Sequence, residues 1–136
     1  MLFTDLNLNN PLLDALAEMG FVQPTTIQHR TFAAVMGGRD ICGIAQTGTG
    51  KTFAYLLPLL WLWKFNKEKN PQILILVPTR ELVVQVVEAV NTLTTYMSVT
   101  AIGAYGGVNI NTQRAELQKG SDVLVATPGR LYDLIL

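Results

Sequence analysis

The sequence predicts an α/β fold in which a parallel sheet carries helices on both faces. From residue 41 onward, short apolar runs alternate with longer helix-forming stretches, as expected when strands and helices follow one another. The run at 72–77 shows no polar alternation, which is typical of a strand that is covered on both faces. Because a helix separates each predicted strand from the next, we expect a parallel sheet with right-handed crossovers.

Two helices are expected before the alternating region. Asn10 suits the N-cap of the first helix and Pro11 its first helical position, and Gly20 suits the exit. A second helix is expected over 26–36, closed by the glycines at 37–38. We therefore assign residues 1–37 to a helical region and residues 38–136 to the part of the domain that contains the sheet.

The remaining elements follow from the alternation. We expect strands at 41–44, 72–77, 99–105 and 122–126, and helices at 51–65, 79–96, 109–119 and 128–135. The first of these strands should be buried, with Cys42 acting as a small hydrophobic residue within it. Thr79 is able to cap the helix that follows the second strand.

Composition excludes several classes of function. With 136 residues and 49% hydrophobic content, the chain can bury the core of a single domain. Ten basic and ten acidic residues balance, so any nucleic-acid binding must come from a few placed groups. One cysteine and one histidine exclude an internal disulfide and a Cys-rich or paired-His metal site. No signal peptide or membrane span is evident, and we expect a cytoplasmic protein with no membrane partner.

The strongest motif lies at 45–52 and consists of Ala45, Gln46, Thr47, Gly48, Thr49, Gly50, Lys51 and Thr52. It follows an apolar run and opens a helix, which is the context of a phosphate-binding loop rather than of an ordinary glycine-rich turn. The glycines let several backbone N–H groups face one point, and the helix adds its positive end. Lys51 can reach the terminal phosphates of a nucleotide, and the Thr52 hydroxyl can ligate Mg²⁺.

Polar and glycine residues also follow each later strand. These clusters are Pro78-Thr79-Arg80-Glu81-Leu82, Tyr105-Gly106-Gly107 and Thr127-Pro128-Gly129-Arg130. The carboxyl ends of parallel strands share one edge, where ligands bind in open α/β folds. Taken singly, the clusters are better explained as helix caps, a turn and surface ion pairs. Together, their Arg, Thr and backbone N–H groups suit an anionic polymer held by its backbone.

This set of motifs resembles the first half of a DEAD-box RNA helicase. Pro24–Gln28 resembles the Q motif, Ala45–Thr52 motif I, Pro78–Leu82 motif Ia, Gly106-Gly107 the GG element and Thr127–Arg130 motif Ib. The resemblance covers essentially the whole chain, and 43–52 is most similar to the bacterial RhlE-like branch. Thr26 replaces the usual second proline of the Q motif, and Val83-Val84 departs from the usual continuation of motif Ia.

The resemblance implies an incomplete RecA-like P-loop NTPase domain that binds ATP and Mg²⁺. It implies that Gln28, in the same motif as Thr25, reads the adenine edge and that Phe3 stacks on the base, although packing under the first helix is an equal alternative for Phe3. Lys51 and Thr52 become the catalytic candidates. The implied contacts to the RNA backbone, independent of sequence, are Pro78, Thr79, Arg80, Gly106, Gly107, Thr127, Pro128, Gly129 and Arg130.

The sequence reaches Leu136 without the family's Asp-Glu-Ala-Asp segment, its Ser-Ala-Thr segment or its second RecA-like domain. Without an acid pair there is no Mg²⁺ carboxylate and no group to position an attacking water. We therefore expect a parent helicase that unwinds or remodels RNA. These residues alone should bind nucleotide and, weakly, RNA, should not hydrolyse ATP, and should self-associate through an open sheet edge. Two alternatives remain: a non-enzymatic nucleotide- or RNA-binding module, and a P-loop ATPase of the recombinase or DNA-helicase type.

Overall fold

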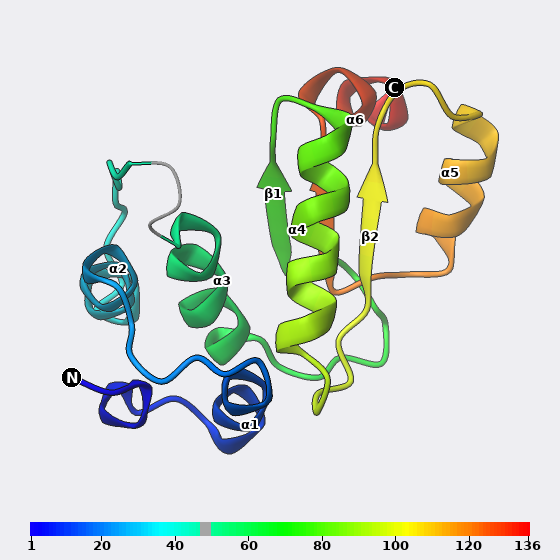
Figure 1. Cartoon of the computed structure of the whole chain (residues 1–136). Helices are drawn as coiled ribbons and strands as arrows, with labels where there is room; N and C mark the ends of the chain where they lie inside the picture. The colour runs from blue at the N-terminus through cyan, green and yellow to red at the C-terminus, as the bar shows by residue number, and fades with distance from the viewer. Residues whose placement is uncertain (47–49) are drawn as a thin grey trace. The chain divides into compact units, whose positions relative to one another are not determined.

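A computed structural model describes residues 1–46 and 50–136 (Figure 1). The chain divides into two compact units. The first unit contains Met1–Trp63 and Thr92–Met97, and the second contains Lys64–Asn91 and Ser98–Leu136. Each unit is described by itself. In the described part of the chain, no helix has the length and apolar character needed to cross a membrane.

The first unit is helical. Its elements are the 3-10 helix η1 (Phe3–Leu6) and the α-helices α1 (Asn10–Glu18), α2 (Thr26–Met36) and α3 (Lys51–Leu62). Helix α2 packs against α3. The buried side chains of the unit come from α1, α2 and α3 above all, and the largest of them that are fully buried are Leu12, Leu16, Leu56, Leu57, Leu60 and Leu93.

Local capping explains where these helices begin and end. The cap of α1 is Asn9, whose side chain accepts a hydrogen bond from the backbone N–H of Leu12, so our assignment of the cap to Asn10 was wrong by one residue. Helix α2 has the predicted bounds and ends at Gly37. Helix α3 ends at Leu62 because Trp63 adopts an extended conformation, three residues before the predicted end at Phe65.

The strand predicted at 41–44 does not form. These residues have no strand assignment, and Ile41 and Ile44 are 44% and 91% exposed. Cys42 is exposed as well, which contradicts the buried role expected for it. An extended segment becomes a strand only when a neighbour pairs with its backbone N–H and C=O groups. Among the described residues, the first unit contains no strand with which this apolar run could pair.

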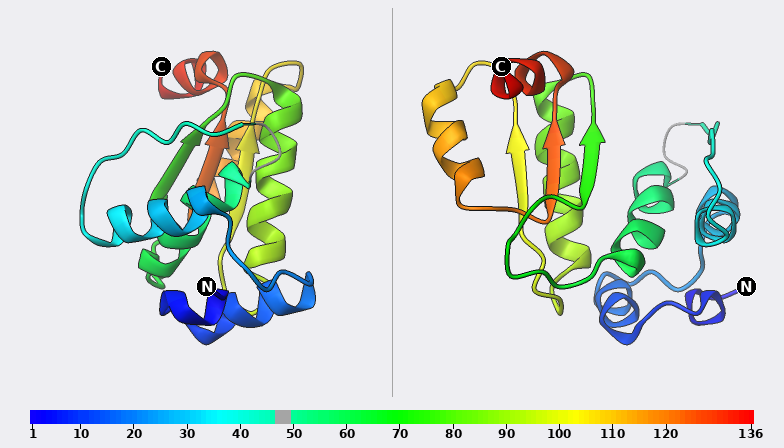
Figure 2. Two further views of the ribbon diagram at one scale, coloured as in Figure 1. Left: turned by 60° about the vertical axis from the view of Figure 1, so that its left-hand side comes forward. Right: turned by 180° about the vertical axis from the view of Figure 1, so that it is seen from behind.

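The second unit contains the sheet. Strands β1 (Ile73–Leu76), β2 (Ala101–Ala104) and β3 (Val123–Ala126) alternate with helices α4 (Arg80–Leu93), α5 (Ile110–Gln118) and α6 (Pro128–Ile135). The strands are parallel and have the order β1-β3-β2 (Figure 2). The sheet therefore has three strands in the described residues instead of the four predicted, and the parallel pairing is confirmed.

Helices cover both faces of this sheet. A Cβ atom on Gly103 would meet Val83 and Val87, so α4 covers the face on which Gly103 lies. On the opposite face, Ala104, Leu124 and Ala126 form a buried cluster against which Leu117 of α5 and Leu131 and Leu134 of α6 pack. The α/β class with helices on both faces is confirmed.

Strand β1 is less covered than predicted. Ile73 and Ile75 are buried on the α4 side, but Leu74 and Leu76 are 53% and 51% exposed. The prediction that both faces of 72–77 are covered was therefore wrong for one face. At the amino end of the sheet, Asp122 is fully buried and pairs with Lys69 through an Nζ–Oδ2 distance of 3.1 Å. The same Oδ2 accepts a hydrogen bond of 2.8 Å from the backbone N–H of Thr100, so one carboxylate ties together the segments that precede all three strands.

Candidate nucleotide and nucleic-acid sites

The predicted adenine-side residues lie at the start of α2 in the first unit. Thr25 is the N-cap, and its hydroxyl accepts a hydrogen bond from the backbone N–H of Gln28. The side chain of Gln28 closes a capping box, because its Oε1 accepts a hydrogen bond of 2.9 Å from the backbone N–H of Thr25. Gln28 is only 6% exposed, so its position is set by this local structure.

Gln28 also contacts the end of the phosphate-loop motif. Its Nε2 donates a hydrogen bond of 3.2 Å to the carbonyl oxygen of Gly50. Gly50 adopts a left-handed conformation with φ of 82° and caps α3, and a Cβ atom there would collide with Gln28 Nε2. Glycine is therefore required at this position for two reasons, its backbone conformation and the close approach of Gln28.

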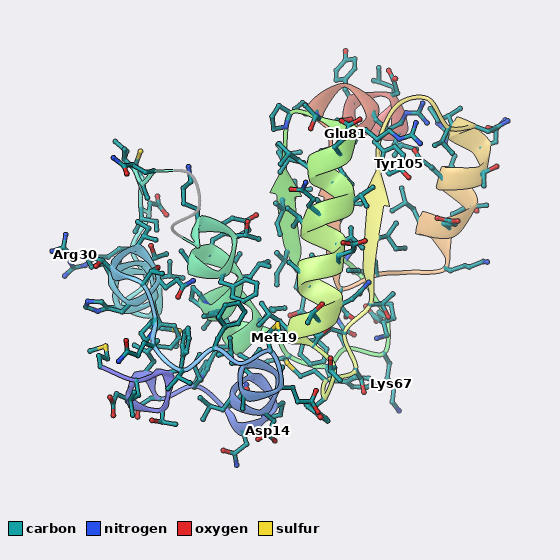
Figure 3. The ribbon with its side chains drawn as sticks, in the orientation of Figure 1. Asp14, Met19, Arg30, Lys67, Glu81 and Tyr105 are labelled. Carbon is teal, nitrogen blue, oxygen red and sulfur yellow. The ribbon has the colours of Figure 1, made fainter. Side chains whose placement is uncertain are left out.

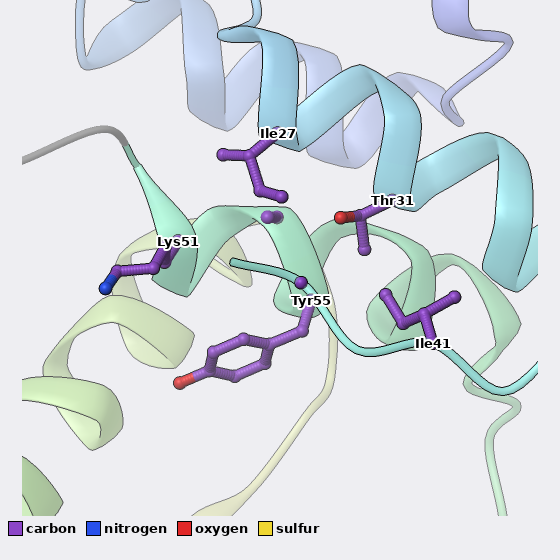
Figure 4. A pocket seen from close by; sticks show the side chains of 7 residues that line it. Ile27, Thr31, Ile41, Lys51 and Tyr55 are labelled. Atoms are coloured by element: carbon purple, nitrogen blue, oxygen red, sulfur yellow. The ribbon is translucent and has the colours of Figure 1, made fainter. Parts of the chain in front are cut away.

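The catalytic candidates Lys51 and Thr52 occupy the first turn of α3. The Lys51 side chain is exposed, and Thr52 shares a hydrogen bond with Tyr55 one turn later. Burial raises the pKa of Tyr55, and the hydrogen bond with Thr52 lowers it in part. Lys51 and Tyr55 line a cavity of about 340 Å³ whose other side is formed by α2 and by the segment around Ile41 (Figure 4).

A second, larger cavity of about 680 Å³ lies where the Q-motif residues meet the beginning of the loop. It is lined by Pro24, Thr25, Thr26, Ile27, Arg30, Ile44, Ala45 and Gln46. The structure therefore brings together the two predicted nucleotide-binding motifs. Thr47, Gly48 and Thr49, also assigned to the nucleotide, lie outside the described residues. Sequence reasoning missed Arg30, which is exposed on α2 (Figure 3), because a lone surface arginine carries no motif.

Phe3 lies in the core of the first unit. Its side chain is 3% exposed, and its backbone N–H donates to the carbonyl oxygen of Val22. A buried ring fits the packing alternative and leaves no free face on which a base could stack. The nearby aromatic contact is between Phe21 and Phe53, whose rings meet edge to face at 5.6 Å.

The candidate RNA contacts lie in the second unit, at the carboxyl edge of its sheet. Thr79 caps α4, since its hydroxyl accepts a hydrogen bond of 3.2 Å from the backbone N–H of Leu82. Thr127 precedes α6 but makes no side-chain capping hydrogen bond, so its hydroxyl is not used as a cap. Its backbone N–H donates to Ala104 at the end of β2, which holds the ends of β2 and β3 together.

The first of the two candidate arginines is exposed. The Arg80 guanidinium lies over the ring of Tyr105, 5.2 Å from Cζ to the ring centroid. Its Nη1 is 3.4 Å from the point that a Cβ atom of Gly107 would occupy. Arg80, Tyr105 and the glycines at 106–107 thus gather at one point, at the end of the unit where Figure 3 labels Glu81 and Tyr105.

The second arginine, Arg130, is half-buried and engaged within the protein. Its Nη1 donates hydrogen bonds of 3.0 Å to the carbonyl oxygen of Val108 and 3.0 Å to Oε1 of Gln113. Gln113 is 5% exposed. Arg130 therefore connects the start of α6 with the loop after Gly107 and with α5, a connection that sequence alone did not reveal.

No cluster of three or more His, Cys, Asp or Glu side chains suited to a metal ion occurs among residues 1–46 and 50–136. Of the described candidates, only the Thr52 hydroxyl was assigned to Mg²⁺. Any ion held there would depend on oxygen ligands that come with a nucleotide or with water.

Comparisons with known proteins give a consistent result. The family model described as DEAD/DEAH box helicase matches residues 25–136. The chain is 45% identical over 133 residues to the probable ATP-dependent RNA helicase DDX27 of Mus musculus, covering 96% of the chain and 18% of that protein. It is 45% identical over 133 residues to the ATP-dependent RNA helicase DeaD of Escherichia coli (strain K12), covering 96% of the chain and 21% of that protein. It is 41% identical over 136 residues to the probable ATP-dependent RNA helicase ddx27 of Dictyostelium discoideum, covering 98% of the chain and 17% of that protein. The chain thus spans about a fifth of the length of these relatives.

Proposed function

Because the chain belongs to the DEAD/DEAH box helicase family, we propose that it is the N-terminal, ATP-binding part of an ATP-dependent RNA helicase that unwinds or remodels RNA. The observation that carries the proposal is the 45% identity over 133 residues to proteins named ATP-dependent RNA helicases. This identity favours the proposal over a recombinase or DNA-helicase type of ATPase. The assignment to an RhlE-like branch stays a prediction.

The family uses ATP, and the residues of the first unit suit a nucleotide. Gly50 adopts a left-handed conformation and is followed by a twelve-residue helix whose positive end favours phosphate. We assign Lys51 to the phosphates and Gln28 and Thr25 to the adenine side. Bound ATP would supply the phosphoryl group that a complete helicase transfers to water.

We further propose that Thr52 contributes one oxygen ligand to Mg²⁺ when nucleotide is bound. A hydroxyl fits this ion, which prefers oxygen ligands and retains several waters. The proposal does not rest on a carboxylate, because the sequence contains no adjacent Asp-Glu pair.

For the second unit we propose contact with the RNA backbone, independent of base sequence. Arg80, the glycines at 106–107 and the Thr127 hydroxyl present donors at one edge of the sheet, and donors of this kind hold phosphate and sugar oxygens. With a formal net charge of zero, the chain has no bulk field to strengthen the contact, so binding should be weak and sensitive to salt.

The decisive experiment titrates ADP by calorimetry against the wild type and Lys51→Ala. Charge-assisted hydrogen bonds are worth about 1.5–3 kcal/mol, so the substitution should weaken ADP roughly tenfold to a hundredfold. Lys67→Ala is a matched control because Lys67 is exposed in the second unit. Equal affinities for wild type and Lys51→Ala would overturn the assignment of the phosphate loop.

A second measurement concerns catalysis by these 136 residues. We expect no phosphate release from ATP above the background rate, with or without saturating single-stranded RNA, because no acid pair is present to hold Mg²⁺ and orient water. RNA-stimulated release would show that another group performs that role and would contradict the proposal.

A further inference from the structure

The arginine that we assign to RNA stands at an unfavourable place for a cation. Arg80 is the first residue of α4, where the positive end of the helix dipole repels positive charge. Among the described residues, Arg80 makes no ion pair and no side-chain hydrogen bond that would offset this repulsion. A long, exposed side chain without such partners would sample many rotamers in solution.

The contact that Arg80 does make is with an aromatic ring. Tyr105 follows β2 directly, and its ring lies 5.2 Å from Arg80 Cζ, within the range of an attractive cation–π interaction. The ring is also partly covered by the protein. Tyr105 is half-buried. Its Cε1 atom lies close to Gly103, at 3.9 Å from the point that a Cβ atom of this glycine would occupy. Together with Val83 and Val87 of α4, Tyr105 lines a cavity of about 190 Å³.

Gly107 completes the arrangement. Its φ of 84° lies in the left-handed region, and a Cβ atom there would stand 3.4 Å from Arg80 Nη1. The absence of a side chain at Gly107 leaves room for Arg80 Nη1 beside the glycine turn while Cζ lies over the ring of Tyr105. The guanidinium N–H groups are therefore presented at the same edge as the backbone N–H groups of that turn.

We propose that Tyr105 is a positioning residue for RNA binding, which holds the Arg80 guanidinium at the sheet edge by its ring face so that it meets an RNA phosphate already oriented. This inference rests on the proposed RNA contact of Arg80 and adds to it a residue that was not among the candidate RNA contacts. The ring, not the hydroxyl, carries the effect. Phe should replace Tyr at this position, and an aliphatic side chain of similar bulk should not.

The test compares Tyr105→Phe, Tyr105→Leu, Arg80→Ala and the double variant Arg80→Ala/Tyr105→Leu. Binding of a fluorescein-labelled oligouridylate is followed by anisotropy at low salt. We expect Tyr105→Phe to bind as the wild type does, and Tyr105→Leu to bind about two- to fivefold more weakly, which is the change that corresponds to an exposed cation–π contact. In the Arg80→Ala background, Tyr105→Leu should have no further effect.

Two controls separate positioning from general structural damage. Tyr132→Leu removes another tyrosine of the second unit, 64% exposed, and should leave binding unchanged. The chemical shifts of the Arg80 side-chain protons, measured without RNA, should show a ring-current displacement in the wild type and in Tyr105→Phe that disappears in Tyr105→Leu.

The possible outcomes distinguish the two proposals. If Arg80→Ala binds as tightly as the wild type, or the wild type does not bind, the proposed RNA contact of Arg80 fails, and the positioning role fails with it. If Arg80→Ala weakens binding but Tyr105→Leu does not, the RNA contact stands and the positioning role is overturned. A Tyr105→Leu effect of equal size in the Arg80→Ala background overturns the positioning role as well, since the ring would then act through other groups.

Discussion

The side-chain amide of Gln28 is hydrogen-bonded to the carbonyl oxygen of Gly50 over 3.2 Å. The residue assigned to the base is thereby connected to the residue immediately before Lys51, which is assigned to the phosphates. Both polar atoms of this amide have partners in the protein, since its oxygen accepts from Thr25. The amide keeps a second N–H and a second lone pair, and base recognition by Gln28 would direct these to the adenine edge, which offers a donor and an acceptor side by side.

Replacing Gln28 with Ala should remove base preference and lower stability together. A site that hydrogen-bonds one base leaves groups unpaired with another, so the wild type should prefer ADP to GDP and Gln28→Ala should not. Loss of the buried amide should lower the free energy of unfolding by about 1–3 kcal/mol. Calorimetric titrations with both nucleotides and urea unfolding measure the two effects.

Asn9→Ala is a suitable control for this variant. It removes the cap of α1, whose hydrogen bond to Leu12 N–H is 3.1 Å, and should lower stability by about 1 kcal/mol without altering base preference. A wild type that binds GDP as tightly as ADP would show that Gln28 is a structural residue only.

Arg130→Ala should affect RNA binding and stability at the same time. The loss of one phosphate contact should reduce the slope of log affinity against log salt concentration by about one unit, without altering base preference. Gln113 Oε1, which is buried, would lose its hydrogen bond from Arg130, so the free energy of unfolding should fall by about 1–3 kcal/mol. Fluorescence anisotropy over a salt series and urea unfolding measure the two changes.

Arg114→Ala removes the same charge from α5, where Arg114 has only a 3.4 Å hydrogen bond to Asn111. It should change neither the salt slope nor stability appreciably. If Arg130→Ala destabilises the protein but leaves the slope of log affinity against log salt concentration unchanged, Arg130 stabilises the loop after Gly107 and does not contact RNA.

The pair of Lys69 and Asp122 should be important for the stability of the second unit. Lys69→Met leaves the fully buried Asp122 without its cation, and removing one partner of a buried pair should cost about 3 kcal/mol, near the lower end of such effects because the Lys69 side chain is 28% exposed. Adding Asp122→Asn should recover part of this loss, since the amide retains an acceptor for Thr100 N–H without a buried charge. Urea unfolding measures the free energy of unfolding of the wild type, of Lys69→Met and of Lys69→Met/Asp122→Asn. A Lys69→Met variant as stable as the wild type would show that the pair contributes nothing.

Much of this fold could be predicted because local chemistry decides it. Thr79 caps α4 and Gly37 follows the end of α2, and each of these signals acts within a few residues. The parallel direction of the strands was predicted from the helices that separate them in the sequence. These predictions needed no knowledge of distant contacts.

The larger errors and omissions depend on contacts between distant residues. The segment at 41–44 has the apolar character of a strand, yet a strand also needs a pairing neighbour. Arg130 reads as a surface cation until its partner Gln113 of α5 is seen. Tyr105 reads as an apolar residue at the end of a strand, and only the folded chain places its ring beneath Arg80.

The final prediction concerns the edge of the sheet formed by β1, one of the two edges that have no strand partner among the described residues. In the order β1-β3-β2, strand β1 pairs with β3 alone, so its other edge has no strand partner among the described residues. Leu74 and Leu76 are 53% and 51% exposed on the face that α4 does not cover. An exposed, apolar edge strand is a template for pairing with another chain, and a charged side chain on such a strand prevents this pairing.

We therefore expect the wild-type chain to self-associate and the variant Leu74→Lys/Leu76→Lys to be monomeric. Circular dichroism verifies that both proteins are folded. Val84→Lys is the control, because Val84 is 41% exposed on helix α4 and not on a strand edge, so this variant should associate as the wild type does. Light scattering over a concentration series measures the mass of each protein. A wild type that stays monomeric at every concentration would show that the edge of β1 is closed to other chains, and association that persists in Leu74→Lys/Leu76→Lys would place the contact elsewhere.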